Sequence, residues 1–360
     1  MTVSPVSEAN SPADAQSESA EQAEPRLGTI LDTWRLDALL AVGSVSKVYL
    51  GTDRRSGHAA IKIMSAELAR DRKLRWRFFR DAIVSERLDH PGVVRIIRKD
   101  VTREGEPFVV MEQLRGAELE RLREDAGGQL SPEVVAYIGL HVAELLDFAH
   151  EHRILHRSVN PENLFVTTTG RIKVLGFAGS WNGEELAEQP GPDVILGPSA
   201  WRAPELDGDT REPGEARSDI YGLGATLYTL VSGHPPRELR EAQWVRTIDA
   251  GQLSATVPAP LAALIAACTA ELLSERPPTM KEVAAHLRAF LQYRLPNEAD
   301  PAGVIGARLS EGATVVAEQT GALLSIDAKA WETASQLRDM FRMIENIFYL
   351  SLIHISEPTR

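Results

Sequence analysis

The feature that most constrains the fold is a change of hydrophobic pattern near Ser131. Before it, short β-rich runs occupy residues 34–41, 43–50 and 59–63, and turn residues at 53–57 separate the last two. Such runs predict a sheet built from hairpins. After it, apolar residues recur at helical spacing, and Ser131 itself suits a helix cap. We therefore expect an α+β protein with a β-rich N-terminal lobe and an α-helical C-terminal lobe.

The remaining elements are predicted from the same patterns. Residues 71–88 predict a helix, which the following His-Pro-Gly ends, and residues 109–111 predict a short buried strand. Helical patterns continue later in the chain, at residues 218–232, 260–273 and 279–292.

Composition narrows the class of protein. The chain has 360 residues, of which 43% are hydrophobic and 25% charged, enough to bury a large core. The net charge of −12 argues against general nucleic-acid binding. Cys268 is the single cysteine, so an internal disulfide is impossible and a reducing cytoplasm is expected. The sequence shows neither a signal peptide nor an apolar run of about 18 residues, so we expect no membrane span.

Two short motifs identify the middle of the chain. Residues 156–163 read H-R-S-V-N-P-E-N, and residues 174–178 read V-L-G-F-A. They resemble the catalytic loop, H-R-D-x-K-P-x-N, and the metal-binding D-F-G segment of eukaryotic-type Ser/Thr protein kinases, including bacterial members. The resemblance implies the two-lobed protein-kinase fold over residues 34–293, with His156 and Phe177 in a stack that links the lobes.

Further motifs of the same family follow in order. Residues 203–205 read A-P-E, and residues 218–224 resemble the helix whose Asp braces the catalytic loop. In this sequence that residue is Asp219. The resemblance also implies an ion pair between Glu205 and Arg276 inside the helical lobe.

The acidic chemistry of such a site is missing. Ser158 stands where the family has its proton-accepting Asp, Asn160 replaces a Lys, and Gly176 replaces the metal-binding Asp. A general base contributes roughly 10²–10⁴-fold in rate, and metal ions add several kcal/mol of charge stabilisation. The sequence therefore predicts no metal site and no intact catalytic set, as in a pseudokinase.

The resemblance also implies positions for a nucleotide. Gly43 is the middle glycine of a degraded Gly-rich loop, and Val48 and Ala60 are placed to sandwich an adenine ring. Lys62 would hold phosphates and pair with Asp81, which is one methylene shorter than the usual Glu. A purely structural Lys62–Asp81 pair is the alternative.

The hinge between the lobes is expected just after the strand at 109–111. Met111 falls at the position that guards the adenine pocket, and Glu112 and Leu114 fall in the hinge itself. The apolar residues are equally explained as lobe core. Asn163 would coordinate magnesium weakly without the lost carboxylate. ATP is therefore a candidate ligand, expected to bind without magnesium if it binds.

These observations predict a binding or regulatory module in bacterial signalling, acting through a protein partner whose identity and stoichiometry the sequence does not give. Two alternatives stay open. One is a weakly active or atypical ATP-dependent Ser/Thr kinase, and the other is a nucleotide sensor without turnover.

The segments outside residues 34–293 are expected to differ in character. Residues 1–27 are acidic and lack apolar periodicity, which predicts a disordered tail. Residues 294–326 are interpreted as a linker. Residues 327–349 predict an amphipathic helix, which either docks elsewhere or packs on its own domain. Residues 350–360 resemble an in-frame translation of a sequencing-library adapter, so they are excluded from fold reasoning and the natural chain is expected to differ there.

Overall fold

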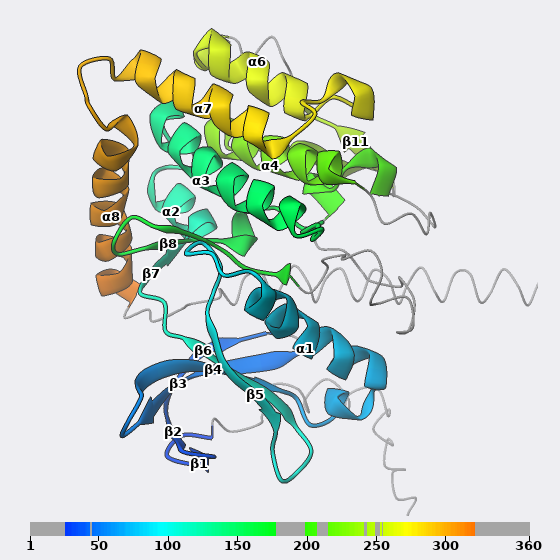
Figure 1. Cartoon of the computed structure of the whole chain (residues 1–360), viewed down its shortest axis with the longest axis vertical. Coiled ribbons are helices and arrows are strands. Elements are labelled where there is room, and N and C mark those ends of the chain that lie inside the picture. The colour runs from blue at the N-terminus through cyan, green and yellow to red at the C-terminus, as the bar shows by residue number, and fades with distance from the viewer. Residues whose placement is uncertain are drawn as a thin grey trace, which may run out of the picture.

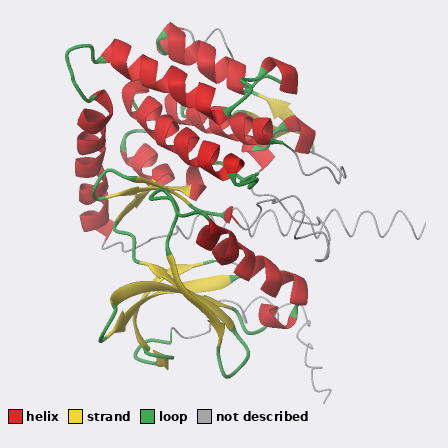
Figure 2. Cartoon of the chain, in the orientation of Figure 1, coloured by secondary structure: helices red, strands yellow, loops and turns green. Residues whose placement is uncertain are grey.

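The computed structural model has two lobes, with the larger sheet in one and most helices in the other (Figures 1 and 2). This arrangement confirms the predicted α+β, kinase-like fold. The structure describes residues 26–43, 45–177, 199–206, 215–240, 243–248, 253 and 255–320.

The N-terminal lobe is an antiparallel sheet in the order β1-β2-β3-β4-β6-β5. Its strands are β1 (Ile30–Leu31), β2 (Trp34–Val42), β3 (Ser46–Asp53), β4 (Gly57–Met64), β5 (Ile96–Val101) and β6 (Pro107–Glu112). The predicted turn joins β3 to β4, where the Asp53 carboxylate accepts hydrogen bonds from the backbone N–H groups of Arg55 and Ser56. The edge strand β5 was not predicted, because five of its six residues are exposed and carry no core signal.

One helix packs on this sheet. It is α1 (Arg72–Arg87), preceded by the short 3₁₀ turn η1 (Leu68–Arg70). Asp71 begins it as a cap, because its carboxylate accepts from the N–H groups of Lys73 and Leu74. Phe78 and Ala82 face the sheet and are buried with Val109 of β6. The predicted helix over 71–88 is confirmed.

The C-terminal lobe surrounds α3, whose cap is the predicted Ser131. Its helices are α2 (Leu119–Asp125), α3 (Pro132–Glu151), α4 (Ala216–Ser232), α6 (Ala259–Cys268), α7 (Met280–Arg294) and the 3₁₀ turns η2 (Pro161–Asn163), η4 (Ser199–Trp201), η5 (Pro204–Leu206) and η6 (Leu273–Glu275). Its strands are β7 (Gly116–Glu118), β8 (Leu164–Thr167), β9 (Ile172–Val174), β10 (Arg237–Arg240) and β11 (Gln243–Arg246). Strands β7, β8 and β9 form a small sheet that lies between the helices of this lobe and the N-terminal sheet (Figure 1). They were not predicted, since three or four residues give too short a pattern to count.

The expected linker at 294–326 is wrong for most of its length. Only residues 295–300 connect α7 to the next helix, α8 (Pro301–Thr320). Helix α8 runs along the side of the helical lobe beside β7 and β8 (Figure 1). Its buried residues Ile305, Leu309 and Ala313 belong to the main core, so the folded unit extends beyond residue 293.

A close backbone approach fixes α8 in place. A Cβ at Gly306 would lie 2.7 Å from the Tyr137 hydroxyl oxygen, and a Cβ at Gly170 would lie 2.3 Å from the Gly306 carbonyl oxygen. The Tyr137 hydroxyl itself donates to the Gly170 carbonyl at 2.9 Å. These glycines therefore permit the contact, although glycine lowers helix propensity.

The ends of the chain are described in part. Arg26 lies within the expected disordered tail at 1–27, but its guanidinium pairs with Glu106 at 2.5 Å, so the expectation is wrong at Arg26. Residues 1–25, the predicted helix at 327–349 and the segment at 350–360 lie outside the described residues. Among the helices that the structure does describe, we find none long and apolar enough to cross a membrane.

The predicted pair between Glu205 and Arg276 is present. Two hydrogen bonds join the guanidinium to the carboxylate, at 2.7 and 2.9 Å. The Arg276 side chain is fully buried, and it also donates to the carbonyls of Ala270, Arg217 and Glu271. Burial would raise the pKa of Glu205, but hydrogen bonds from Arg276 and neighbouring groups outweigh it and lower the pKa.

We predict that Glu205→Ala costs about 3 kcal/mol of unfolding free energy, because Arg276 is left as an uncompensated buried charge. The Glu205→Ala, Arg276→Ala double variant should lose less than the sum of the single losses, measured by urea unfolding.

The exposed pair between Glu133 and Arg294 is the control, with an expected coupling below about 1 kcal/mol.

Because the folded pKa of Glu205 is lowered, the stability that the Glu205 carboxylate contributes is present above the unfolded pKa of about 4.3. It is lost as pH falls through the folded pKa. Additive losses at neutral pH would contradict the pairing.

Candidate functional site

The buried carboxylate of Asp219, at the start of α4, supports the segment at 156–163. It accepts hydrogen bonds from the backbone N–H groups of His156 at 2.8 Å and Arg157 at 2.6 Å. The His150 Nε2 lies 2.8 Å away on the same carboxylate. Burial would raise the pKa of Asp219, but hydrogen bonding to His150 and to the backbone N–H of Arg157 outweighs it and lowers the pKa. The predicted brace is therefore in place.

His156 joins this segment to the one at 174–178. Its Nε2 lies 2.9 Å from the Leu175 carbonyl oxygen, and its Nδ1 lies 3.2 Å from the Ser158 backbone nitrogen. Nε2 must donate and Nδ1 must accept, so the ring is neutral. Complete burial lowers the pKa of His156, in agreement with that state. The His156 ring packs edge-on against the Phe177 ring, with 4.6 Å between the ring centres, which is the predicted stack.

Ser158 is held by a neutral neighbour. The Asn163 side-chain amide donates to the Ser158 carbonyl oxygen at 2.7 Å and lies 3.2 Å from its hydroxyl oxygen. This contact uses the Asn163 amide within the loop. Because residue 158 is a serine, no carboxylate stands at the position that would accept a substrate proton.

Asn160 has become part of the loop's internal structure. Its side-chain oxygen accepts from the backbone N–H groups of Glu162 at 2.9 Å and Asn163 at 3.2 Å, which caps η2. Only 2% of Asn160 is exposed. The side chain that replaces the family's Lys is therefore directed into the loop.

A side chain at Gly176 would be strained in this structure. Its φ is +83°, and an added Cβ would lie 2.7 Å from the Asn163 Oδ1 and 2.8 Å from its Cγ. The Asn163 carboxamide therefore fills the space where a side chain at position 176 would begin. No group of three His, Cys, Asp or Glu side chains gathers to bind a metal anywhere in the described ranges.

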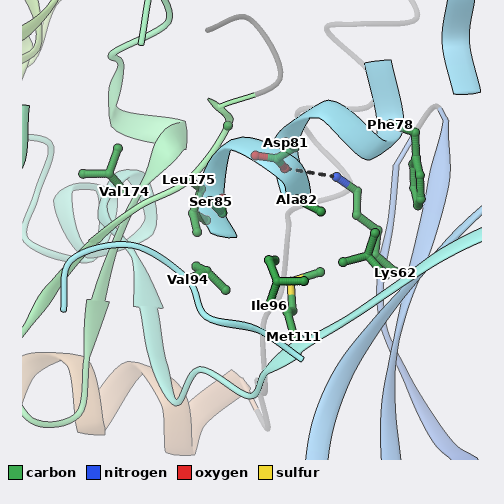
Figure 3. Close-up of a pocket in the computed structure, with 12 residues that line it drawn as sticks. Lys62, Phe78, Asp81, Ala82, Ser85, Val94, Ile96, Met111, Val174 and Leu175 are labelled. Carbon is green, nitrogen blue, oxygen red and sulfur yellow. Dashed lines mark ion pairs between the residues drawn. The ribbon is translucent and has the colours of Figure 1, made fainter. Parts of the chain in front are cut away.

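Lys62 and Asp81 face each other across one end of a small cavity (Figure 3). The Lys62 Nζ lies 3.9 Å from the Asp81 Oδ2, at the limit of an ion pair. It also lies 5.6 Å from the centre of the Phe78 ring. The cavity volume is about 50 Å³, which is enough for a few waters. Its walls are Lys62, Phe78, Asp81, Ala82, Ser85, Val94, Ile96, Val109, Met111, Val174, Leu175 and Gly176.

The residues expected around adenine lie beside this cavity in an apolar cluster. Val48, Ala60 and Leu114 are buried there together with Phe165, and Met111 packs against the cluster from the cavity side. Phe165 was not predicted as a site residue. A single apolar residue in a four-residue strand carries no sequence signal that separates it from ordinary core.

The hinge acid Glu112 is turned away from that cluster. Its Oε1 accepts from the Lys173 ammonium at 2.5 Å and from the Arg95 backbone N–H at 2.8 Å. The same ammonium donates to the Val93 carbonyl at 2.9 Å. Lys173 of β9 therefore fixes the hinge, a role that sequence analysis missed.

Gly43 begins a closed turn. Its N–H donates to the Ser46 carbonyl at 2.8 Å, where β2 meets β3. That donor is committed to the backbone in this structure and would have to be released before it could bind phosphate. Of the sequence-predicted residues, Lys62, Asp81 and Met111 line the cavity, and Val48, Ala60 and Leu114 lie in the adjoining cluster. Gly43, Glu112 and Asn163 hydrogen-bond to other groups of the chain.

Comparison with known proteins places these residues in a family context. A family model described as protein kinase domain matches residues 34–292. The crystal structure of the Mycobacterium tuberculosis PknI kinase domain matches with a TM-score of 0.56 and 26% identity, covering 73% of this chain and 98% of that one.

Two curated relatives are longer proteins. The probable serine/threonine-protein kinase PknB of Corynebacterium glutamicum is 36% identical over 216 residues, which cover 58% of this chain and 33% of the relative. The serine/threonine-protein kinase PknB of Mycobacterium leprae is 32% identical over 213 residues, covering 57% and 33%. This chain therefore matches only about a third of the length of these relatives.

We predict that Gly176→Asp lowers the unfolding free energy by roughly 1–3 kcal/mol, because it adds a side chain at positive φ against Asn163. Gly105→Asp is a matched control, since Gly105 has φ +87° and open space around an added Cβ. The Gly105 variant should lose less stability, measured by urea unfolding.

The Asn163→Ala change should reduce the cost of Gly176→Asp, since it removes the clashing carboxamide. Equal losses at positions 105 and 176, or no coupling between positions 163 and 176, would show that the carboxamide does not fill this space.

Proposed function

Because the chain belongs to the protein kinase domain family, we propose that it is a pseudokinase, a binding or regulatory module with little or no phosphoryl transfer. We place it in bacterial signalling in the cytoplasm, with another protein as its partner. Its relatives of known name are serine/threonine-protein kinases, so this proposal concerns how the present chain departs from them.

The observation that carries the proposal is the position of Asn163. Its carboxamide bonds to Ser158 and lies where a side chain at Gly176 would need to be. The proton acceptor and the metal ligand are therefore both lost, and the space between their positions is filled by a neutral amide. Asn160 adds to this, because its amide is committed to capping η2.

The size of the loss supports inactivity. A missing general base costs roughly 10²–10⁴-fold, and phosphoryl transfer depends further on metal ions that neutralise the developing charge. Lys62 alone cannot supply this charge, and its ion pair with Asp81 is long, at 3.9 Å.

The retained architecture supports a binding role. Asp219 holds the loop at 156–163, and Glu205 pairs with Arg276. Both interactions are structural, so a domain that transfers no phosphate would still need them. Such interactions stabilise the helical lobe, and a stable fold is what a partner-binding domain requires.

We predict that the purified chain transfers no phosphate to itself or to a generic acceptor above background, because Ser158 and Gly176 provide neither base nor metal ligand. Incorporation of radiolabelled phosphate from ATP with magnesium is the measurement. Transfer that disappears in Lys62→Met would instead establish a weakly active kinase.

Single reversions should not restore activity. Ser158→Asp leaves the metal ligand missing, and Gly176→Asp meets Asn163. Groups that act as one unit are strongly non-additive, so any recovery is expected only when Ser158→Asp, Asn160→Lys and Gly176→Asp are combined.

A nucleotide sensor is the second candidate function. The observation that favours it is that Lys62 and Asp81 still face each other beside Met111, as a phosphate-binding Lys and its partner would. We predict that any ATP binding is independent of magnesium, because position 176 carries no carboxylate. Thermal-shift titrations with and without magnesium test this, and a shift that requires magnesium would contradict it.

A further inference from the structure

Helix α8 lies directly against the turn that joins β8 to β9. The Ser310 hydroxyl donates to the Thr168 carbonyl at 2.5 Å. One turn of helix earlier, the Gly306 carbonyl oxygen is so close to Gly170 that a Cβ there would lie 2.3 Å away. The helix therefore touches the turn at 167–170 at two points, one a hydrogen bond and the other a close backbone approach.

The same turn is bonded to the segment that leaves the hinge. The Thr168 N–H donates to the Arg115 carbonyl at 2.8 Å, and β7, which begins at the next residue, pairs with β8. Arg115 follows Leu114, which is buried in the apolar cluster between the lobes. Through Thr168 alone, two successive hydrogen bonds thus connect Ser310 of α8 to the end of the hinge.

Helix α8 has little stability of its own. Glycine is unfavourable inside a helix, and α8 carries glycines at 303, 306 and 312. Over residues 302–314 its buried side chains are Ile305, Leu309 and Ala313, whereas α3 buries eleven residues along its length of 20. Because most helical stability in proteins comes from packing, we expect α8 to be helical only while it is docked.

The place of α8 in the chain allows it to leave by itself. Residues 295–300 join it to α7, and the other elements that the structure describes all come before it. Its undocking therefore breaks only the contacts between α8 and the lobe. The hydrogen bond from the Tyr137 hydroxyl to the Gly170 carbonyl can persist, since both groups belong to the lobe.

We propose that α8 is a releasable strap, which holds the turn at 167–170 against the end of the hinge while it is docked and loosens that turn when it leaves. The strap gives the domain a second state that a partner can select, because a ligand shifts an equilibrium by binding its two states unequally. This inference concerns α8 and the hinge, and it holds whether or not the cleft transfers phosphate.

Hydrogen exchange of the full chain, resolved to single amides, tests whether α8 opens by itself. Elements with few buried contacts open at lower free energy than the core. The α8 amides, corrected for their intrinsic rates, should therefore exchange at least tenfold faster than those of α3. Equal corrected rates would show that α8 opens only with the whole domain and would overturn the proposal.

Gly306→Ala and Gly312→Ala are matched variants on the same helix. A Cβ at position 306 would lie 2.7 Å from the Tyr137 hydroxyl oxygen, whereas one at position 312 meets open space. Gly306→Ala should speed α8 exchange on the order of tenfold, because the new methyl group disturbs docking. Gly312→Ala should slow it roughly fivefold, because alanine is the better helix former. Changes in the same direction would overturn the docking geometry.

The Thr168 N–H reports whether α8 reaches the hinge segment. Its exchange should become faster in Gly306→Ala and slower in Gly312→Ala, in step with the α8 amides. The Ser65 N–H, which donates to the Val45 carbonyl at 2.9 Å in the N-terminal lobe, is the control and should not change. A Thr168 amide that keeps its wild-type rate while α8 exchange changes would overturn the strap.

Ser310→Ala covers the case in which Gly306→Ala disturbs the whole domain. This variant removes the hydroxyl that donates to the Thr168 carbonyl and adds no atoms. Exchange of the α8 amides and of the Thr168 N–H should rise by about two- to tenfold, the range expected for one hydrogen bond. Unchanged exchange at both places would show that this bond does not hold the strap and would overturn the proposal.

Discussion

The carboxylate of Asp219 is the interaction on which the rest of the site depends. It is fully buried, and it is stable there because two backbone N–H groups and His150 satisfy it. Through these bonds α4 fixes His156, which in turn holds the Leu175 carbonyl and the Phe177 ring. The geometry of the cleft is thus set by a charge that takes no part in chemistry, so it persists when the catalytic charges are lost.

When the charged side chains are replaced, the polar groups around them still need hydrogen-bond partners. Buried polar groups that lack partners are costly, and Asn160 and Asn163 meet this need with neutral amides that bond to the loop itself. Gly176 removes the remaining side chain, which lets the Asn163 carboxamide approach. The three replaced positions, Ser158, Asn160 and Gly176, therefore all lie against Asn163, which the motif retains.

Sequence reasoning succeeded where a motif or a long period carried the information. The two lobes, the cap at Ser131, the Asp219 brace and the Glu205–Arg276 pair were predicted correctly. It failed at α8, which was interpreted as part of a linker, because a tertiary contact at Gly306 requires the glycine that propensity penalises. It also missed Phe165 and Lys173, whose roles depend on which face of a three- or four-residue strand they occupy.

Asn163 and Phe165 lie two residues apart in the chain, and their side chains reach different parts of the cleft. Asn163 lies against Gly176, and Phe165 is buried in the apolar cluster between the lobes. Because η2 and β8 are continuous in the chain, both are positioned by the loop that Asp219 holds. A kinase must leave this cleft open and lets ligands bring the lobes together. In this chain apolar side chains of both lobes pack together in one cluster, an arrangement that fits the proposed role as a binding module.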